Sequence, residues 1–362
     1  MEDNRNRALF FQTVFAGALG EKAPALTANC VPDFLEWGSR FHVYGILAYD
    51  RAFAALCPEA ERRELEDRAY RITRRLLVQE NEQQKVLAFL NAQNIPFILL
   101  KGAVIRRLYP EKEMRPSVDV DIFYDRRFRD KVRTGLPALG FALADSDPNH
   151  DVFAQKFVKF EMHHNLLCQF PEDAAFFEGI WERAEAGEGA ERRFCTDDLY
   201  IYHLLHAKRH FISGEMNLLM LTDLLLLHRL PDFSAERLAP KLSALRLTGF
   251  EKSLFDLATS LAAGKPLSPE EEEFFTFAYL APEDHSLSYS RYTGKGSRAG
   301  YYFKNLFPSF SYMKEKYPAL QKAPLLLPFY WGKRIVGFLF GKKKVSVNEK
   351  ADATELFRRL SL

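Results

Sequence analysis

The chain has 362 residues, with 50 Lys and Arg against 48 Asp and Glu, and 47% of its residues are hydrophobic. This length suggests two or three domains, and the composition excludes a disordered chain. A formal net charge of +2 gives the chain as a whole no electrostatic reason to bind nucleic acid.

The cysteines and the apolar runs indicate the compartment. Cys30, Cys57, Cys168 and Cys195 are scattered without CxxC spacing, which argues against a disulfide framework or a cysteine zinc site. The first twenty residues hold a short apolar run behind a head of mixed charge, which favours a first helix over a secretory signal. No run approaches the ~18 apolar residues of a membrane span. We therefore expect a cytoplasmic protein with no transmembrane segment.

Apolar periodicity divides the chain into four regions. In residues 1–93 apolar side chains recur every three or four residues, which predicts an N-terminal helical region. Within it, residues 61–93 predict one long charged helix, or two helices with a break near Asn81. Residues 94–190 read strand, helix, strand, helix, strand, which indicates an α/β module. Residues 191–285 return to helical periodicity, and residues 286–362 form a basic aromatic tail with few clear periods.

The residues that point to chemistry lie in the stretch LLKGAVIRRLYPEKEMRPSVDVDIFYD. Asp119 and Asp121 are two apart on a predicted strand, so both side chains leave the same face, about 7 Å apart at the backbone. Such paired carboxylates suit Mg²⁺ (or Mn²⁺), which takes its remaining ligands from water and substrate phosphates. Two such ions would stabilise the attacking and leaving oxygens of phosphoryl transfer.

A second element precedes this pair. Lys101 and Gly102 end a predicted buried strand and open a helix. A glycine at this turn lets a phosphate approach the backbone, and Lys101 would add a positive charge against a triphosphate. The alternative for Lys101 is a solvated strand end, and for Arg115 a structural ion pair with Asp119 or Glu113.

Together these motifs resemble the polymerase-β-type nucleotidyltransferase superfamily. The fuller string, from Lys-Gly through Tyr-Pro to Arg…Asp-x-Asp, is similar to the uncharacterised nucleotidyltransferase family within it, and the similarity covers most of residues 90–330. The resemblance implies an α+β fold in which a nucleotidyltransferase α/β core is flanked by N-terminal and C-terminal helical regions. One departure from the superfamily is that Ala103 follows the glycine where Ser or Gly is usual.

The resemblance also assigns roles. Glu161, in the string FEMH, would be the third metal-binding or general-base carboxylate, beside Asp119 and Asp121 as metal-binding and catalytic residues. Lys101, Gly102, Arg115 and His163 would contact the nucleotide. A solvated strand face predicts the same alternation of Lys159, Glu161 and His163, whereas His164 should point to the other face.

Three histidines lie on one predicted helix face. His203, His206 and His210 are spaced i, i+3 and i+7. Zinc binding, lining of a nucleotide or acceptor pocket, and helix packing all remain open for them, although no HExxH motif is present. Asp223 is alone in an apolar helix and needs a partner if buried, for which a histidine or Arg209 is the natural candidate.

Residues 291–344 hide a charge asymmetry behind the balanced total. They contain 12 Lys and Arg against the single Glu315, together with thirteen aromatic residues. Either the aromatics pack on the core as a structural wrap, or the segment is a weak surface for an anionic partner, nucleic acid or acidic lipid.

We predict from these observations a magnesium-dependent enzyme that transfers a nucleoside monophosphate from a nucleoside triphosphate to a hydroxyl of an unknown acceptor. The alternative is a catalytically silent module that keeps the fold and binds a nucleotide or a partner.

Overall fold

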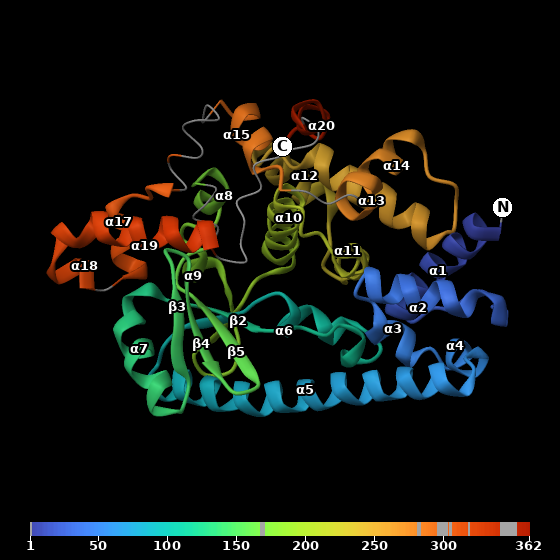
Figure 1. Cartoon of the computed structure of the whole chain (residues 1–362), viewed down its shortest axis with the longest axis horizontal. Coiled ribbons are helices and arrows are strands. Elements are labelled where there is room, and N and C mark those ends of the chain that lie inside the picture. The colour runs from blue at the N-terminus through green and yellow to red at the C-terminus, as the bar shows by residue number, and fades with distance from the viewer. Residues whose placement is uncertain are drawn as a thin grey trace.

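The structure is a computed structural model that describes residues 2–166, 171–280, 284–294, 303, 306–317, 319–340 and 353–362. A mixed β-sheet lies between one long helix on one side and a group of helices on the other (Figure 1). Among the described residues, no helix is long and apolar enough to cross a membrane.

The sheet has seven strands in the order β3-β4-β5-β2-β1-β7-β6. At its centre β2 pairs in parallel with β5 and antiparallel with β1, and the register places Asp121 directly opposite Glu161. The bounds of the strands are β1 Phe97–Leu99, β2 Val120–Tyr124, β3 Ala142–Ser146, β4 His150–Gln155, β5 Val158–His163, β6 Glu185–Ala186 and β7 Glu191–Arg193.

The N-terminal helices lead into a single unbroken helix, α5, which runs beneath the sheet (Figure 1). Ion pairs at i, i+3 and i, i+4 along its exposed face, such as Arg68 with Glu64 and Arg71 with Asp67, support this length. The elements before the sheet are α1 Glu2–Leu19, η1 Ala28–Cys30, α2 Val31–Arg40, α3 Tyr44–Tyr49, α4 Arg51–Leu56 and α5 Glu59–Ala92.

Short helices connect the strands, and a helical group follows them. Between the strands lie α6 Gly102–Ile105, η2 Arg106–Leu108, η3 Lys112–Met114, η4 Arg126–Phe128, α7 Arg129–Ala138, α8 Pro171–Ala175 and α9 Ile180–Arg183. After β7 come α10 Thr196–Ser213, α11 Leu219–His228, α12 Ala235–Ala244, α13 Thr248–Ala262, α14 Pro269–Phe275 and η5 Thr276–Leu280. The C-terminal helices are α15 Ser286–Tyr292, α17 Phe310–Lys316, α18 Ala319–Lys322, η6 Pro324–Leu326, α19 Leu327–Phe340 and α20 Thr354–Arg359.

Two hydrophobic clusters stabilise the molecule. The smaller one fills the space between the sheet, α7 and the C-terminal half of α5, with Tyr124, Phe141 and Phe160 at its centre. The larger one joins the N-terminal helices to α10–α14, so that Phe11 of α1 packs edge-on against Phe275 of α14. The N-terminal helices and α10–α14, although far apart in the sequence, therefore share one core. The sheet lies between this larger cluster and the smaller one.

The expected α+β architecture with helical flanks is confirmed. The predicted strands around residues 97–99 and 120–124 are present, and the segment after residue 150 is a hairpin of β4 and β5. The helix of residues 61–93 is not broken at Asn81. Strands β3, β6 and β7 were not predicted.

The basic tail is partly exposed. Phe303 and Phe329 are 64% and 66% exposed, whereas Tyr330 stacks on Tyr317 and Trp331 donates a hydrogen bond to the carbonyl of Pro308. Tyr301, Tyr302 and Lys342–Lys344, which we expected to contribute to an anionic surface, lie outside the described residues.

Candidate active site

A cleft of about 880 Å³ opens between α5, the turn after β1, the start of β2, and α10 with α11. It is lined by Asp119, Asp121 and Glu161 at one end, together with Lys101, Gly102 and Arg115. The structure therefore brings six of the seven site residues predicted from the sequence into one cavity. A volume of this size is in the usual range for small-molecule and cofactor sites.

The carboxylates come from two neighbouring strands. Asp121 and Glu161 lie opposite one another on β2 and β5, and Asp119 lies one residue before β2. Asp121 is 4% exposed, and the side chains of Glu161 and Asp119 are 16% and 28% exposed. Parallel pairing in this register explains why residues forty apart in the sequence face the same cleft.

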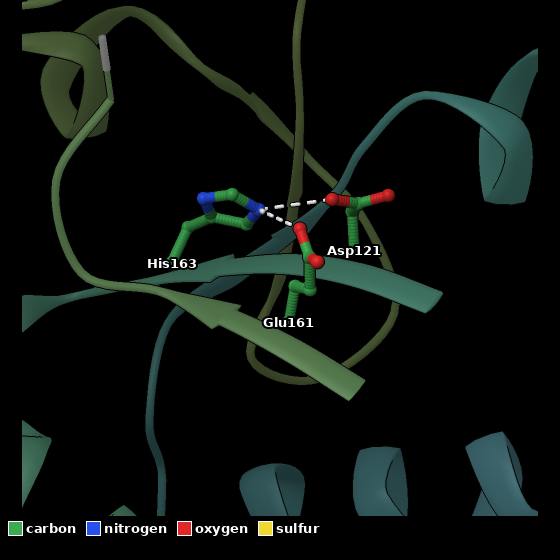
Figure 2. A group of neighbouring side chains, drawn as sticks. All are labelled: Asp121, Glu161 and His163. Atoms are coloured by element: carbon green, nitrogen blue, oxygen red, sulfur yellow. Dashed lines mark hydrogen bonds and ion pairs between the residues drawn. The ribbon is translucent and has the colours of Figure 1, made fainter. Parts of the chain in front are cut away.

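His163 lies beside the two strand carboxylates (Figure 2). Its Nε2 atom is 2.9 Å from Oδ1 of Asp121 and 3.7 Å from Oε2 of Glu161. Because a carboxylate only accepts, Nε2 carries the proton, and burial lowers the pKa of this histidine despite the neighbouring negative charge. Asp121, Glu161 and His163 offer ligand atoms that lie within 4.8 Å of one another, and the carboxylate of Asp119 is not part of this group.

Two lysines are in contact with the carboxylates. Lys101 Nζ lies 2.6 Å from Oδ1 of Asp121 and 4.0 Å from Oε2 of Glu161. Lys159 Nζ lies 2.7 Å from Oε1 of Glu161 and 3.2 Å from Oδ2 of Asp119. Three carboxylates face two ammonium groups and a neutral histidine, so one negative charge is not compensated within the group. No described residue donates a hydrogen bond to Oδ2 of Asp121.

The pKa values reflect this arrangement. Burial opposes ionisation of Asp121, but the charge of Lys101 and the hydrogen bond from His163 hold its pKa far below the usual range. Burial and the charges of Asp121 and Glu161 raise the pKa of Asp119. Burial works against the charge of Lys101 as well, yet its pKa is raised because the negative charge of Asp121 outweighs this penalty.

The turn after β1 has an unusual backbone. Lys101 has φ 47° and ψ −124°, a left-handed conformation that costs free energy in a residue with a Cβ atom. The amide of Ala103 donates to the carbonyl of Leu100, which closes the turn. A strained backbone conformation persists where surrounding contacts hold the residue in place. Here the ion pair with Asp121 holds Lys101.

Gly102 lies beneath two guanidinium groups. A Cβ atom at this position would lie 3.1 Å from Cβ of Ser117, 3.3 Å from an Nη atom of Arg115 and 3.4 Å from an Nη atom of Arg106. The Nε atom of Arg106 donates to the carbonyl of Gly102, and this arginine is only 6% exposed. Burial and the charge of Arg115 lower the pKa of Arg106 to about 10. No carboxylate among the described residues forms an ion pair with Arg106.

Arg115 forms an ion pair with Asp223, a residue of helix α11. Its Nε and Nη2 atoms donate to the carboxylate of Asp223 on α11, at 3.1 and 2.8 Å from Oδ2, and the hydroxyl of Tyr109 donates to Oδ1 at 2.7 Å. The sequence suggested a histidine or Arg209 as the partner of Asp223. The partner is instead Arg115, because the chain passes α11 before it enters β2. Arg115 correspondingly pairs with neither Asp119 nor Glu113.

The three histidines of α10 separate into two kinds. His203 is buried, and its Nε2 atom lies 2.9 Å from the carbonyl of Met220, so it packs between α10 and α11. His206 and His210 line the cleft, with their Nε2 atoms 3.1 Å apart. Burial is the main reason that the pKa of His210 falls to about 3 and that the pKa of His206 falls well below its ordinary value.

The sequence placed Lys159 on the same strand face as Glu161, and the structure brings the two into contact. Two other neighbours of the site were overlooked: His150 reaches Glu161, and Arg106 approaches Gly102. The spacing of Gly102 and Arg106 by four residues was a usable signal, since it places the arginine over the first turn of a helix. His164 faces away from the cleft, as predicted, and contacts the ring of Tyr124.

The comparison with known protein families agrees with this geometry. A family described as uncharacterised nucleotidyltransferase matches residues 31–263. The chain belongs to the uncharacterised nucleotidyltransferase family. Neither a curated protein nor a solved structure matches it significantly. Membership indicates nucleotidyl transfer as the class of reaction and a nucleotide as substrate, and the matched region includes the whole set of carboxylates, lysines and arginines described above.

Proposed function

We propose that this protein is a nucleotidyltransferase that uses a divalent cation, Mg²⁺ or Mn²⁺, to move a nucleoside monophosphate from a nucleoside triphosphate to an acceptor hydroxyl. The observation that carries this proposal is the pairing of Asp121 with Glu161 on adjacent strands, inside a cleft that is also lined by Lys101, Gly102 and Arg115. An acidic end and a basic end next to each other suit a metal ion and the phosphates that it binds.

The residues present fit a divalent cation. Asp119, Asp121 and Glu161 supply hard oxygen donors, and Oδ2 of Asp121 is free of hydrogen bonds from described residues. Lys101 and Lys159 already sit against these oxygens, which shows that the group attracts positive charge. When bound, the cation would neutralise charge on the transferring phosphate. His163 would orient Asp121 through its Nε2–H.

The basic end fits the triphosphate. Arg106 and Arg115 converge on Gly102, where a Cβ atom would crowd both guanidinium groups, so glycine lets them lie close to the backbone. These guanidinium groups would provide phosphate donors that the missing serine at position 103 does not. Glu161 would accept the proton of the acceptor hydroxyl, and positioning and charge neutralisation would supply most of the rate.

The alternative is a silent nucleotide-binding module with the same fold. The lysine contacts on the carboxylates are compatible with it, since a permanent ion pair is also a structural solution. Retention of three carboxylates with an uncompensated charge favours the enzyme.

Two measurements test the proposal. Nucleoside triphosphates should raise the thermal unfolding midpoint only with Mg²⁺ or Mn²⁺ present, and pyrophosphate should be released when acceptors are supplied.

Arg106→Gln should weaken nucleotide binding by about tenfold, the value of one charged hydrogen bond. Arg107→Gln is the matched control, because Arg107 is exposed, whereas Arg106 is buried against Gly102. Stabilisation without pyrophosphate release would identify the silent module, and no stabilisation by any triphosphate would contradict both.

A further inference from the structure

The cleft extends beyond the predicted metal and phosphate groups, along α5. Gln79 donates a hydrogen bond to the carbonyl of Ser117, which places this point of the helix beside the carboxylates. From there the cleft is lined, one turn after another, by Arg75, Arg71 and Arg68. At 1.5 Å per residue, these arginines lie about 6 to 16 Å along the helix axis from Gln79.

The opposite wall is also basic. Arg209 of α10 lines the same cleft, next to His206 and His210, and Asn217 lines it from the loop before α11. The Oδ1 atom of Asn217 is buried without a hydrogen-bond partner among the described residues. Such an atom is uncommon in a folded protein, and an ordered water or a bound group can satisfy it.

The arginines that line the cleft differ in their ion pairs with the described residues. Arg68 and Arg71 pair with Glu64 and Asp67 along the helix. No described residue forms an ion pair with Arg75 or Arg209. The helix itself cannot supply one, because the residues three and four away from Arg75 are Arg71, Ile72, Val78 and Gln79, and those around Arg209 are Leu205, His206, Ile212 and Ser213.

We propose that Arg75 and Arg209 bind a phosphate group carried by the acceptor substrate. This inference rests on the proposed function, because it places the triphosphate at Gly102 and leaves the distal arm of the cleft for the acceptor. Guanidinium groups from two walls suit a tetrahedral oxyanion, and Ile72, Leu76 and Met220 give the arm an apolar floor for the body of the molecule. The acceptor hydroxyl then lies at the carboxylate end, about one helical turn along α5 from its phosphate.

The test uses inorganic phosphate as the probe. It is titrated calorimetrically into the full-length protein, both alone and saturated with Mg²⁺ and an α,β-methylene nucleoside triphosphate. Phosphate should bind the saturated protein at one site. Arg75→Glu and Arg209→Glu should each weaken this binding by about tenfold or more, since each removes a charged hydrogen bond. Affinity for the magnesium nucleotide should change by less than about twofold, because the two anion sites are separate.

Matched variants keep the result interpretable. Arg74→Glu makes the same charge change on the adjacent position of α5, but Arg74 is exposed and does not line the cleft, so phosphate affinity should be unaltered. Arg75→Gln and Arg209→Gln repeat the test without reversing charge. Thermal unfolding midpoints equal to that of the unaltered chain verify folding.

The outcomes separate this inference from the proposed function. If the saturated protein binds no phosphate, or binds it equally in all variants, the acceptor site is refuted while nucleotidyl transfer stands. If Arg75→Glu and Arg209→Glu abolish nucleotide binding instead, these arginines hold the nucleotide's own phosphates, and the inference is again refuted. If no nucleotide binds the unaltered chain, the proposed function fails, and the titration without nucleotide decides the phosphate site by itself.

Discussion

Two buried aspartates on β2 and β4, the two strands that flank β5, differ in how their charge is satisfied. Asp151 of β4 is fully buried and accepts hydrogen bonds from Arg129, Arg133 and Ser146, which occupy both of its oxygens. Asp121 of β2 receives Lys101 and His163 on Oδ1 only, and shares its surroundings with Glu161. Across the β4–β5 pair, Glu161 lies opposite Val152, so Asp151 points to the other face of the sheet.

The difference separates a structural ion pair from a candidate site. Around Asp151 the guanidinium groups of Arg129 and Arg133 both pair with one carboxylate, so the group joins α7 to the sheet. Around Asp121 negative charge exceeds positive charge and a cleft gives access to it. Burial and a depressed pKa are common to both aspartates. What distinguishes them is the balance of charge and the access to solvent.

The largest expected effect comes from neutralising the accessible aspartate. Asp121→Asn, and separately Asp119→Asn, should reduce magnesium-dependent nucleotide turnover by at least about 100-fold, since each removes a charged ligand. Asp119→Asn should leave folding intact or improve it, because burial and the neighbouring carboxylates raise the pKa of Asp119. Asp121→Asn should lower the free energy of unfolding, because it leaves the partly buried Lys101 without its counter-charge. Pyrophosphate release and urea unfolding measure the two effects. Full activity of both variants with a verified substrate would refute the mechanism.

The opposite result is expected for the enclosed aspartate. Asp151→Asn should lower the free energy of unfolding by about 3–5 kcal/mol, because two arginines would be left without their buried counter-charge. Nucleotide affinity in the folded fraction should not change. Urea unfolding and nucleotide titration measure both quantities. If Asp151→Asn were harmless while Asp121→Asn unfolded the chain, the roles of the two clusters would be reversed.

A third test uses the pH dependence of the free energy of unfolding, which His206 and His210 of the accessible cleft should control. Burial keeps both histidines neutral in the folded chain, with the pKa of His210 lowered from 6.5 to about 3. Stability is therefore complete above the unfolded pKa of 6.5 and is lost as the pH falls toward the folded value. The expected slope is about 1.4 kcal/mol per pH unit for each histidine. Urea unfolding between pH 7.5 and 4.5 should show a shallower slope for His210→Asn, and an equal slope would contradict this account.

The smallest effect concerns the exposed basic tail, where neither aspartate cluster contributes. Leu325 is 95% exposed and Phe329 66% exposed, near the exposed Lys333. We expect weak binding to vesicles that contain acidic lipid, with each basic residue contributing about 1 kcal/mol or less, and weaker binding as salt rises. Phe329→Glu should reduce it further. Binding that is insensitive to salt, or stronger binding to RNA than to vesicles, would contradict the lipid interpretation.

The central strands and the carboxylate set were predictable because their signals are local. A period of two in VDVDIFYD places Asp119 and Asp121 on one face, and the alternation Lys159, Glu161, His163 does the same on β5. The parallel pairing that brings the two strands into register is not local and was not predicted, although the resemblance to a family assigned Glu161 to the same site as the two aspartates. The roles of these residues remain predictions until turnover is measured.

The missed elements lack such signals. Four of the five residues of β3 are exposed, and β6 and β7 consist mainly of charged residues at one edge, so no apolar alternation marks them. The partner of Asp223 was missed for a different reason. Arg115 is 108 residues away in the sequence, and only the packing of α11 against the loop before β2 brings the two together.

The length of α5 fixes a distance inside the cleft. Its 34 residues form one helix, and the hydrogen bond from Gln79 to Ser117 sets its register against the strand that carries the aspartates. Arg75 therefore stands at a set number of turns from Asp121, and a helix without a break does not shorten to suit a smaller molecule. Under the proposed acceptor site, α5 works as a molecular ruler: a molecule whose hydroxyl and phosphate are spaced to match reaches both ends at once, and one of another length reaches only one.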